Sequence, residues 1–352
     1  HSSQVTAYRR SLRTALFSAV LSTPPSLLTR LSGGPVIADG EPLQPATRTM
    51  LILRERLGLA KDSHDVAERR DSMRDASALA MPVARRVTVS SGTLPGAVDD
   101  RPVRIYRPWD RDPGPAPVIL YLHGGGWVVG DLDTHDAVCR EVAVAGGLTV
   151  VAVDYRLAPE FPFPAGLEDV VAAFRHLRDH PLAGEQPGAV ALMGDSAGGN
   201  LSAAAALLLR DSGEVGPAAL GLMYPATDLT LASPSIDRFG DGYFLTRDDM
   251  EWYRGHYAPD PDQWMDPLVS PMFADDLSGL PPTWVWTAGF DPLRDEGATF
   301  ADRLSAAGVS VHHHCFGDQI HGFASMGFLP GGLTRLQAMA TQLRQLLDVP
   351  PS

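Results

Sequence analysis

The sequence predicts an α/β fold with a mostly parallel, doubly wound central sheet that is flanked by helices. From about residue 84 onward, short apolar segments alternate with segments of helical character. The apolar segments are rich in valine, isoleucine and leucine, which is typical of parallel strands covered by helices on both faces. Regular alternation of strands and helices favours a parallel sheet with helical crossovers. A chain of 352 residues is also long enough to bury such a core without disulfides or metals.

The expected elements of this sheet follow in chain order. Residues 87–89 and 103–106 alternate between apolar and polar side chains, which predicts two strands. The buried parallel strands are expected at residues 118–122, 149–153, 189–193, 220–223 and 283–286. The helices that accompany them are expected near residues 134–146, 166–179, 197–210, 293–307 and 333–347.

The N-terminal segment, residues 1–82, has a different character. Residues 4–22 and 45–80 predict two helices, and the glycines and prolines between them are typical of turns. These helices cannot form a domain of ordinary size on their own. We therefore expect this segment to pack over another part of the chain.

The first of these two helices also loosely resembles a signal peptide, because arginines precede the apolar run at residues 15–21. The run is short for that role, and Pro24 and Pro25 follow it in place of a small-residue cleavage site. It is far too short to cross a bilayer. We expect an amphipathic cap helix and no stable membrane insertion. Residues 1–3 resemble the remnant of an expression tag.

One long interruption divides the predicted core into two parts. Residues 225–282 are aromatic and acidic, and they are longer than a simple crossover between neighbouring strands needs. We therefore expect a core formed by residues 83–224 and 283–352, with residues 225–282 as an insertion.

Composition excludes some classes of partner. The formal net charge is −13, whereas binding of nucleic acid depends on clustered lysine and arginine, so no nucleic-acid partner is expected. Solubility explains the acidic balance itself. The two cysteines, Cys139 and Cys315, are too few for a disulfide framework, which favours a reducing compartment and predicts a cytoplasmic location.

Residues 194–199, with the sequence G-D-S-A-G-G, contain the first candidate for catalysis. They directly follow a predicted strand and open an alanine-rich helix. A serine between glycines at a sharp strand-to-helix turn is the pattern of a nucleophile elbow, which exposes the hydroxyl of Ser196 above the sheet. The helix would also direct its positive N-terminal end at that hydroxyl. The pattern alone is weak, and the flanking strand and helix make it specific.

Residues 123–127, with the sequence H-G-G-G-W, lie at the end of another buried strand. Glycines there let backbone amides approach a reacting oxygen, so the amides of Gly125, Gly126 and Ala197 are candidates for an oxyanion hole. A flexible turn or a phosphate-binding loop is the competing interpretation, but the spacing matches neither of the common phosphate-loop patterns. His123 is expected to brace the loop.

A serine nucleophile needs a base, and the base needs an orienting group. The partners of a nucleophile elbow follow in the order Ser, Asp, His. Asp291 lies at the C-terminal edge of a predicted strand, whereas the helix dipole already explains Asp295 and Glu296 in the next helical turn. His321 lies in a loop after the last strand-like run and is the candidate base. The histidines at 312–314 are interpreted as sheet and surface positions, and no metal site is predicted.

These residues resemble the hormone-sensitive-lipase-like esterases, the bacterial family IV of α/β-hydrolases. The matching motifs occur in order along nearly the whole chain, at residues 39–40, 123–127, 154–160, 194–199, 291–293 and 321–323. The resemblance implies an α/β-hydrolase fold with a helical cap that the N-terminal helices and the insertion build together. It also implies a carboxylesterase that hydrolyses short- to medium-chain acyl esters without a cofactor. Some members of the family pair through an exposed edge strand, so a homodimer is compatible with the resemblance.

The resemblance implies a mechanism in which Ser196 attacks the ester carbonyl, His321 acts as general base and acid, and Asp291 orients the histidine. The predicted pocket walls are aromatic: Trp127, Tyr155, Phe244 and Tyr257. Each of these rings has packing inside the cap as its competing interpretation.

Other classes of protein share this scaffold. A non-catalytic ligand-binding homologue has no need to keep all three of these side chains, and a dehydratase would not need the serine. An amidase or deacetylase, or an acyltransferase, would use the same triad as an esterase. The sequence alone leaves these last alternatives open.

Overall fold

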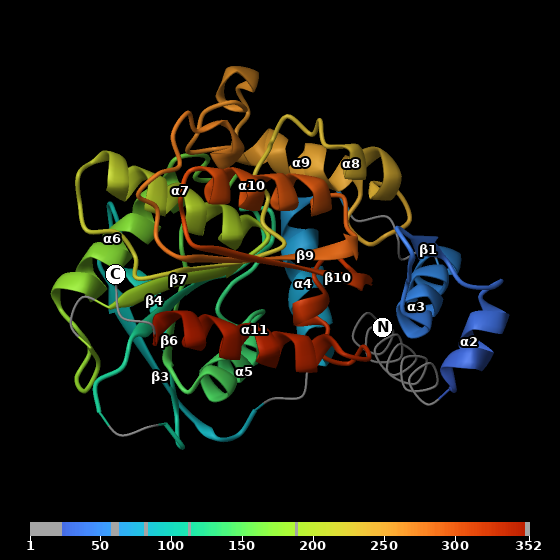
Figure 1. Ribbon diagram of the computed structural model, residues 1–352, viewed down its shortest axis with the longest axis horizontal. Helices are drawn as coiled ribbons and strands as arrows, with labels where there is room; N and C mark the ends of the chain where they lie inside the picture. Colours follow the sequence, from blue (N-terminus) through green and yellow to red (C-terminus); the bar gives the residue numbers. More distant parts are fainter. Residues whose placement is uncertain (1–22, 58–62, 81–83, 112–113, 187–188, 349–352) are drawn as a thin grey trace.

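A computed structural model describes residues 23–57, 63–80, 84–111, 114–186 and 189–348. Its centre is an eight-stranded sheet in the order β10-β9-β8-β7-β5-β6-β4-β3 (Figure 1). The strands from β10 to β6 are parallel, whereas β4 is antiparallel to both β6 and β3. The mostly parallel sheet with flanking helices that the sequence predicts is thereby confirmed.

Three strands, β5, β6 and β8, have the predicted bounds, whereas β3, β4, β7 and β9 extend beyond their predicted ranges. Their bounds are β3 (Val87–Leu94), β4 (Arg101–Pro108), β5 (Val118–Leu122), β6 (Thr149–Val153), β7 (Val190–Asp195), β8 (Leu220–Met223), β9 (Thr283–Phe290) and β10 (Val311–Ile320). Every residue of β5, β6, β7 and β8 is buried, as continuous apolar strands between two helical layers should be. The consecutive histidines at 312–314 lie exposed on the edge strand β10.

Helices cover both faces of the sheet. One layer contains α6 (Ala165–Asp179), α7 (Ala197–Asp211) and α10 (Arg294–Ala306), and the other contains α5 (Asp136–Gly146) and α11 (Gly332–Leu347) (Figure 1). All five were predicted from the sequence to within two or three residues.

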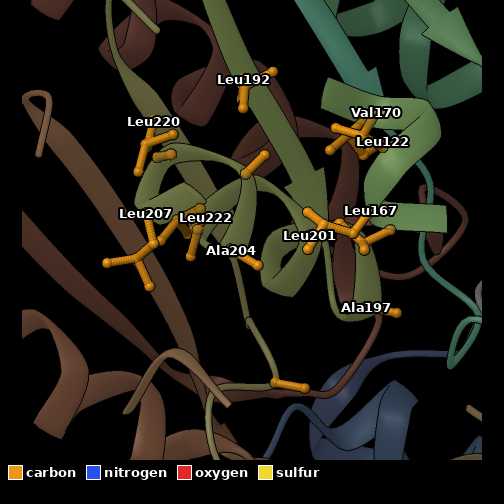
Figure 2. Close-up of a cluster of buried hydrophobic side chains, with 14 of the residues drawn as sticks. Leu122, Leu167, Val170, Leu192, Ala197, Leu201, Ala204, Leu207, Leu220 and Leu222 are labelled. Atoms are coloured by element: carbon orange, nitrogen blue, oxygen red, sulfur yellow. The ribbon is translucent and has the colours of Figure 1, made fainter. Parts of the chain in front are cut away.

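The larger core lies between the sheet and the layer of α6 and α7. Figure 2 shows part of it, including Leu122 and Leu192 from the sheet, Leu167 of α6 and Leu201 of α7. The small alanine side chains of α7 let this helix pack closely against the strands; Ala203, Ala204 and Ala205 are fully buried. Burial of this kind stabilises the fold by about 25 cal/mol for each Å² of apolar surface. The dense packing gives α7 a fixed position behind β7.

The N-terminal segment differs from the prediction in one respect. It contains α2 (Pro25–Leu31), the strand pair β1 (Ile37–Ala38) and β2 (Glu41–Pro42), α3 (Pro45–Arg56) and α4 (Val66–Ala80). The prediction of one helix over residues 45–80 is therefore wrong. The predicted helix at residues 4–22 lies outside the described residues.

A local hydrogen bond explains the start of a new helix at α4. The side chain of Asp65 accepts a hydrogen bond of 2.9 Å from the backbone amide of Glu68. This is the N-cap arrangement, which satisfies an amide that the helix itself cannot satisfy. Leu57 is the C-cap of α3, and its backbone amide donates to the carbonyls of Leu53 and Glu55.

The insertion between β8 and β9 holds α8 (Pro234–Phe239), α9 (Arg247–Tyr257) and two single-turn helices, η1 (Pro261–Gln263) and η2 (Pro271–Phe273). A third such turn, η3 (Phe323–Ser325), follows β10. Thr246 and Asp249 form a capping box that fixes the start of α9. Among the helices that the structure describes, none combines the length and the apolar character that crossing a bilayer requires.

Candidate active site

Ser196 occupies a strained turn between the end of β7 and the start of α7. Its backbone has φ 55° and ψ −116°, a conformation that residues with a side chain rarely adopt. The residues on either side of it are buried, whereas Ser196 itself is partly exposed. Strain at a single exposed serine of this kind is the geometry of a nucleophile elbow.

The glycines of the elbow are required by close packing. A Cβ on Gly198 would collide with the carbonyl oxygen of Leu122 at the end of β5, and a Cβ on Gly194 would collide with the backbone of Gly198. Only glycine allows the two strand ends and the helix start to approach this closely. The motif is therefore a packing requirement as well as a source of the turn.

His321 connects the serine to a buried carboxylate. Its Nε2 lies 3.0 Å from Oγ of Ser196, and its Nδ1 lies 2.8 Å from Oδ2 of Asp291. Asp291 directly follows β9 and is fully buried, and His321 directly follows β10 and is 6% exposed. The other carboxylate oxygen, Oδ1, accepts the amide of Leu293 at 2.8 Å, which fixes the carboxylate plane. The structure therefore brings together all three residues that the sequence predicted to form a triad.

Tyr224 packs against the imidazole of His321, and Phe323 supports Tyr224 in turn. Tyr224, which follows β8 and is 1% exposed, meets His321 edge-on with ring centroids 4.9 Å apart. Phe323 packs in turn against Tyr224 at 5.5 Å. This packing leaves the imidazole few alternative orientations.

Backbone amides surround the space beside Ser196. In the part of the chain that the structure describes, the amides of Gly125, Gly126 and Ala197 donate to no protein acceptor. Gly125 and Gly126 have positive φ angles of 121° and 57° and are partly exposed. Ala197 begins α7, so its amide also carries the partial positive charge of a helix N-terminus. Such free amides can bind a developing negative charge.

Asp195, the residue before the serine, anchors the segment of residues 123–127, which we call the glycine loop. Its Oδ1 accepts the amide of Gly124 at 2.9 Å and the hydroxyl of Tyr121 at 2.7 Å. His135 Nε2 lies 3.5 Å from its Oδ2. Burial raises the pKa of the Asp195 carboxyl, but His135 and the Tyr121 hydroxyl outweigh burial and hold this pKa below its ordinary value. The sequence motif alone predicts no role for Asp195.

His123 and Tyr155 form a second support for the loop. Nδ1 of His123 lies 2.8 Å from the carbonyl oxygen of Gly124, and the hydroxyl of Tyr155 donates to the carbonyl of His123 at 2.7 Å. The two rings stack with centroids 4.4 Å apart. Burial lowers the pKa of His123 to about 4, so the ring is neutral at physiological pH. Tyr155, predicted as a pocket wall, is 2% exposed and is part of this support.

The other predicted pocket residues lie around the loop and the base. Trp127 and Tyr257 stack face to face at 4.3 Å, and both are buried. Phe244 is partly exposed, has φ 80°, and its ring lies 3.5 Å from the position of a Cβ on Gly322. Phe244 therefore lies next to the residue that follows His321.

Sequence reasoning missed Tyr253, whose partly exposed ring lies directly on Gly126. A Cβ on Gly126 would overlap three atoms of this ring. The helical spacing could have indicated this residue, because Tyr257, which was predicted as a pocket wall, lies one helical turn further along α9 and therefore on the same face. Within the described residues, no group of three or more histidine, cysteine, aspartate or glutamate side chains is arranged to hold a metal ion.

Residues 119–325 match the model of a family described by the alpha/beta hydrolase fold. The chain belongs to this family. The resemblance to the hormone-sensitive-lipase-like esterases is confirmed, and so is the α/β-hydrolase fold.

Curated relatives with this similarity are named as ester hydrolases. The chain is 42% identical over 311 residues to the carboxylic ester hydrolase LipN of Mycobacterium tuberculosis, an alignment that covers 86% of this chain and 82% of LipN. It is 44% identical to the carboxylesterase NlhH of the same species over 65% of this chain and 73% of NlhH. An ethyl acetate hydrolase of Pseudomonas putida is 40% identical, with 64% of this chain and 72% of that protein covered.

Solved structures give the same result. The ester hydrolase EH1AB1 from the metagenome of Lake Arreo superposes with a TM-score of 0.83 at 38% identity, over 87% of this chain and 100% of that one. An esterase of Pyrobaculum calidifontis superposes with a TM-score of 0.76 at 38% identity, over 85% of this chain and 99% of that one. The chain is thus a carboxylic ester hydrolase.

Proposed function

We propose that this enzyme is a serine carboxylesterase that hydrolyses short- to medium-chain acyl esters through an acyl-enzyme intermediate. The observation that carries the proposal is the chain of two hydrogen bonds from Ser196 through His321 to Asp291, at 3.0 and 2.8 Å. Both distances are within the range at which a proton can pass from nucleophile to base. The order of the three residues along the chain also fits the α/β-hydrolase pattern.

In the first half of the reaction, Nε2 of His321 takes the proton of the Ser196 hydroxyl while Oγ attacks the ester carbonyl. Asp291 stays ionised and stabilises the imidazolium that forms. His321 then gives its proton to the oxygen of the leaving alcohol, and the acyl group stays on Ser196. In the second half, His321 activates a water molecule, which releases the carboxylic acid and restores the serine.

The amides of Gly125, Gly126 and Ala197 stabilise the oxyanion of each tetrahedral intermediate. They are already oriented before the reaction, because Asp195 and His123 hold the glycine loop. Pre-oriented donors of this kind lower the barrier by about 2.7–4 kcal/mol each. The protein's own groups supply every proton transfer and every donor, so the mechanism needs no metal or cofactor.

The names of two relatives support a small ester as the substrate. One relative is named an ethyl acetate hydrolase and others are named carboxylesterases. We therefore propose a small ester as the substrate, with an acyl chain of short to medium length. The same mechanism could also cleave an amide bond, so amide substrates need to be compared with esters.

We also propose a cap that consists of residues 1–82 and 225–282, over a core of residues 83–224 and 283–352. The support is contact between the two cap segments: Arg69 of α4 pairs with Asp249 of α9 at 3.0 Å, and both side chains are buried. Both segments also contact the region of the glycine loop. Arg70 of α4 donates to the carbonyl of Val128, directly after the loop, and the ring of Tyr253 lies on Gly126. A cytoplasmic location and a homodimer stay predictions.

The test is a panel of p-nitrophenyl esters of increasing acyl length beside the matched anilides, with wild type, Ser196→Ala and His321→Ala. We expect efficient ester cleavage that is best at short to medium chains, with both variants reduced by several orders of magnitude. Anilides that are cleaved as well as the esters would favour an amidase. Full activity in Ser196→Ala would exclude the mechanism.

A further inference from the structure

Two partly exposed aromatic rings flank the site, and they contact different parts of it. The ring of Tyr253 lies on Gly126 of the proposed oxyanion loop, whereas the ring of Phe244 lies beside Gly322, next to His321. The two rings come from different places in the insertion, with Tyr253 on α9 and Phe244 in the loop before it. They therefore meet different portions of a bound ester.

The chemistry of the proposed mechanism decides which portion each ring meets. His321 must protonate the leaving alcohol, so the alcohol portion lies on the side of the imidazole and of Phe244. The carbonyl oxygen is directed at the amides of Gly125, Gly126 and Ala197. The acyl chain takes neither of these directions, and the partly exposed ring of Tyr253, which covers Gly126, is available to contact it.

Tyr253 has little freedom to move away, because α9 is anchored near both ends. At its start, Asp249 accepts hydrogen bonds from the backbone amide and the hydroxyl of Thr246 at 3.2 and 2.7 Å. Near its end, Arg254 donates to the carbonyl of Leu229 at 2.9 Å and lies 3.5 Å over the ring of Trp264.

Arg69 of α4 anchors this part of α9 from the N-terminal segment. Its Nη2 lies 3.0 Å from Oδ1 of Asp249, with side-chain exposures of 6% and 10%. The same guanidinium lies 4.0 Å from the ring centroid of Trp252 and 5.3 Å from that of Tyr253. A buried arginine that contacts both the helix start and the aromatic ring fixes how far the ring extends over the loop.

We propose that Tyr253 sets the acyl-chain preference of this enzyme, and that Arg69 is the positioning residue that holds Tyr253 over Gly126. The inference rests on the proposed serine esterase mechanism. The side chain of Tyr253 limits the space for the acyl chain beside the glycine loop, so long acyl chains are disfavoured. Arg69 touches no reacting atom and acts only through α9.

The measured quantity is the ratio of kcat/KM for p-nitrophenyl octanoate to kcat/KM for p-nitrophenyl acetate, with the purified full chain. Tyr253→Ala is expected to raise this ratio about tenfold, because discrimination of this size is typical of one obstructing group in an apolar pocket. Tyr253→Phe keeps the ring and is expected to keep the wild-type ratio. Phe244→Ala is expected to change the preference among acetate esters of larger and smaller alcohols instead.

Arg69→Met is expected to raise the octanoate ratio in the same direction as Tyr253→Ala. Arg74→Met is the matched control, because Arg74 lies on the same helix but pairs with Asp131, at 2.7 Å, instead of with α9. If Arg69 acts through Tyr253, adding Arg69→Met to Tyr253→Ala changes the ratio no further. Asp249→Asn provides a second variant of the same anchor, and circular dichroism identifies any variant that does not fold.

An unchanged ratio in Tyr253→Ala would overturn the inference, and so would an Arg69→Met effect that persists undiminished without the tyrosine ring. These outcomes are distinct from a failure of the mechanism itself. An active Ser196→Ala would remove the proposed function, whereas an inactive Ser196→Ala together with an unchanged ratio would remove only the role of Tyr253.

Discussion

The carboxylate of Asp195 accepts a hydrogen bond from the backbone amide of Gly124 at 2.9 Å and so joins the nucleophile elbow to the glycine loop. The two residues are 71 positions apart in the chain, and both lie where a central strand ends. The same oxygen also accepts the hydroxyl of Tyr121. This buried carboxylate therefore helps to fix the relative position of Ser196 and the amides that serve it.

We predict that Asp195→Ala lowers kcat by about 10- to 100-fold with a smaller change in KM, because the oxyanion donors lose their alignment. Asp195→Asn keeps an oxygen acceptor for Gly124 and should recover most of the loss. Steady-state kinetics on a short acyl ester check this. Equal kcat in wild type and Asp195→Ala would show that the loop holds its shape without the carboxylate.

Glu296 gives a prediction about stability at alkaline pH. Its Oε1 accepts the amides of Thr227 and Asp228 at 2.7 and 3.1 Å, and burial raises the pKa of this carboxyl well above its ordinary value. The folded state therefore keeps a proton that the unfolded chain releases above its own pKa of about 4.5, and stability is lost as the pH rises beyond that value. Glu296→Gln keeps the acceptor and cannot ionise. We expect its Tm to exceed that of wild type by an amount that grows from pH 5 to pH 9; a constant or negative difference would contradict the assignment.

His123 gives the opposite pH dependence. Its pKa is about 4 in the folded state against 6.5 without burial, so the unfolded chain binds a proton more readily between these two values. The stabilisation from neutral His123 is present above pH 6.5 and is lost as the pH falls towards 4, by about 3 kcal/mol in total. Denaturant unfolding at pH 7 and pH 4.5 should show this loss reduced in His123→Gln. His64→Gln, at an exposed histidine, should keep the full loss.

Two glycine substitutions should have opposite effects. Gly198→Ala would drive a methyl group into the backbone of Leu122, so we expect a loss of several degrees in Tm together with low activity. Gly255→Ala, in α9, meets no atom within 4 Å and should stabilise the helix by about 0.5–1 kcal/mol. Thermal unfolding measures both, and a neutral Gly198→Ala would mean that the elbow has more room than its packing indicates.

Much of the fold and the triad could be predicted from the sequence because the signals are local. A continuous apolar strand, a glycine-rich turn and a helix start lie within a few residues of Ser196, and Asp291 and His321 each follow a strand whose neighbours fix where it ends. Parallel strands then place these ends at one edge of the sheet, which brings distant residues together.

The missed features depend on contacts that no local pattern encodes. Arg69 and Asp249 are 180 positions apart in the chain. The sequence pattern of a charged helix predicts that Arg69 is exposed to solvent, whereas α9 buries it in the folded protein. Asp195 has the same character, since its acceptor role appears only when β5 and β7 lie side by side. The break between α3 and α4 was missed because the cap that starts α4 is a single aspartate, Asp65, within a run rich in charged residues.

The most direct test of the central claim is to trap the acyl-enzyme and locate the acyl group. Wild-type enzyme is mixed with a p-nitrophenyl ester, quenched in acid within the first turnover and digested, and the peptides are analysed by mass spectrometry. We predict one acyl group per active chain, attached to Ser196, and none in Ser196→Ala. An acyl group on another residue, or turnover in Ser196→Ala at the wild-type rate, would contradict the account.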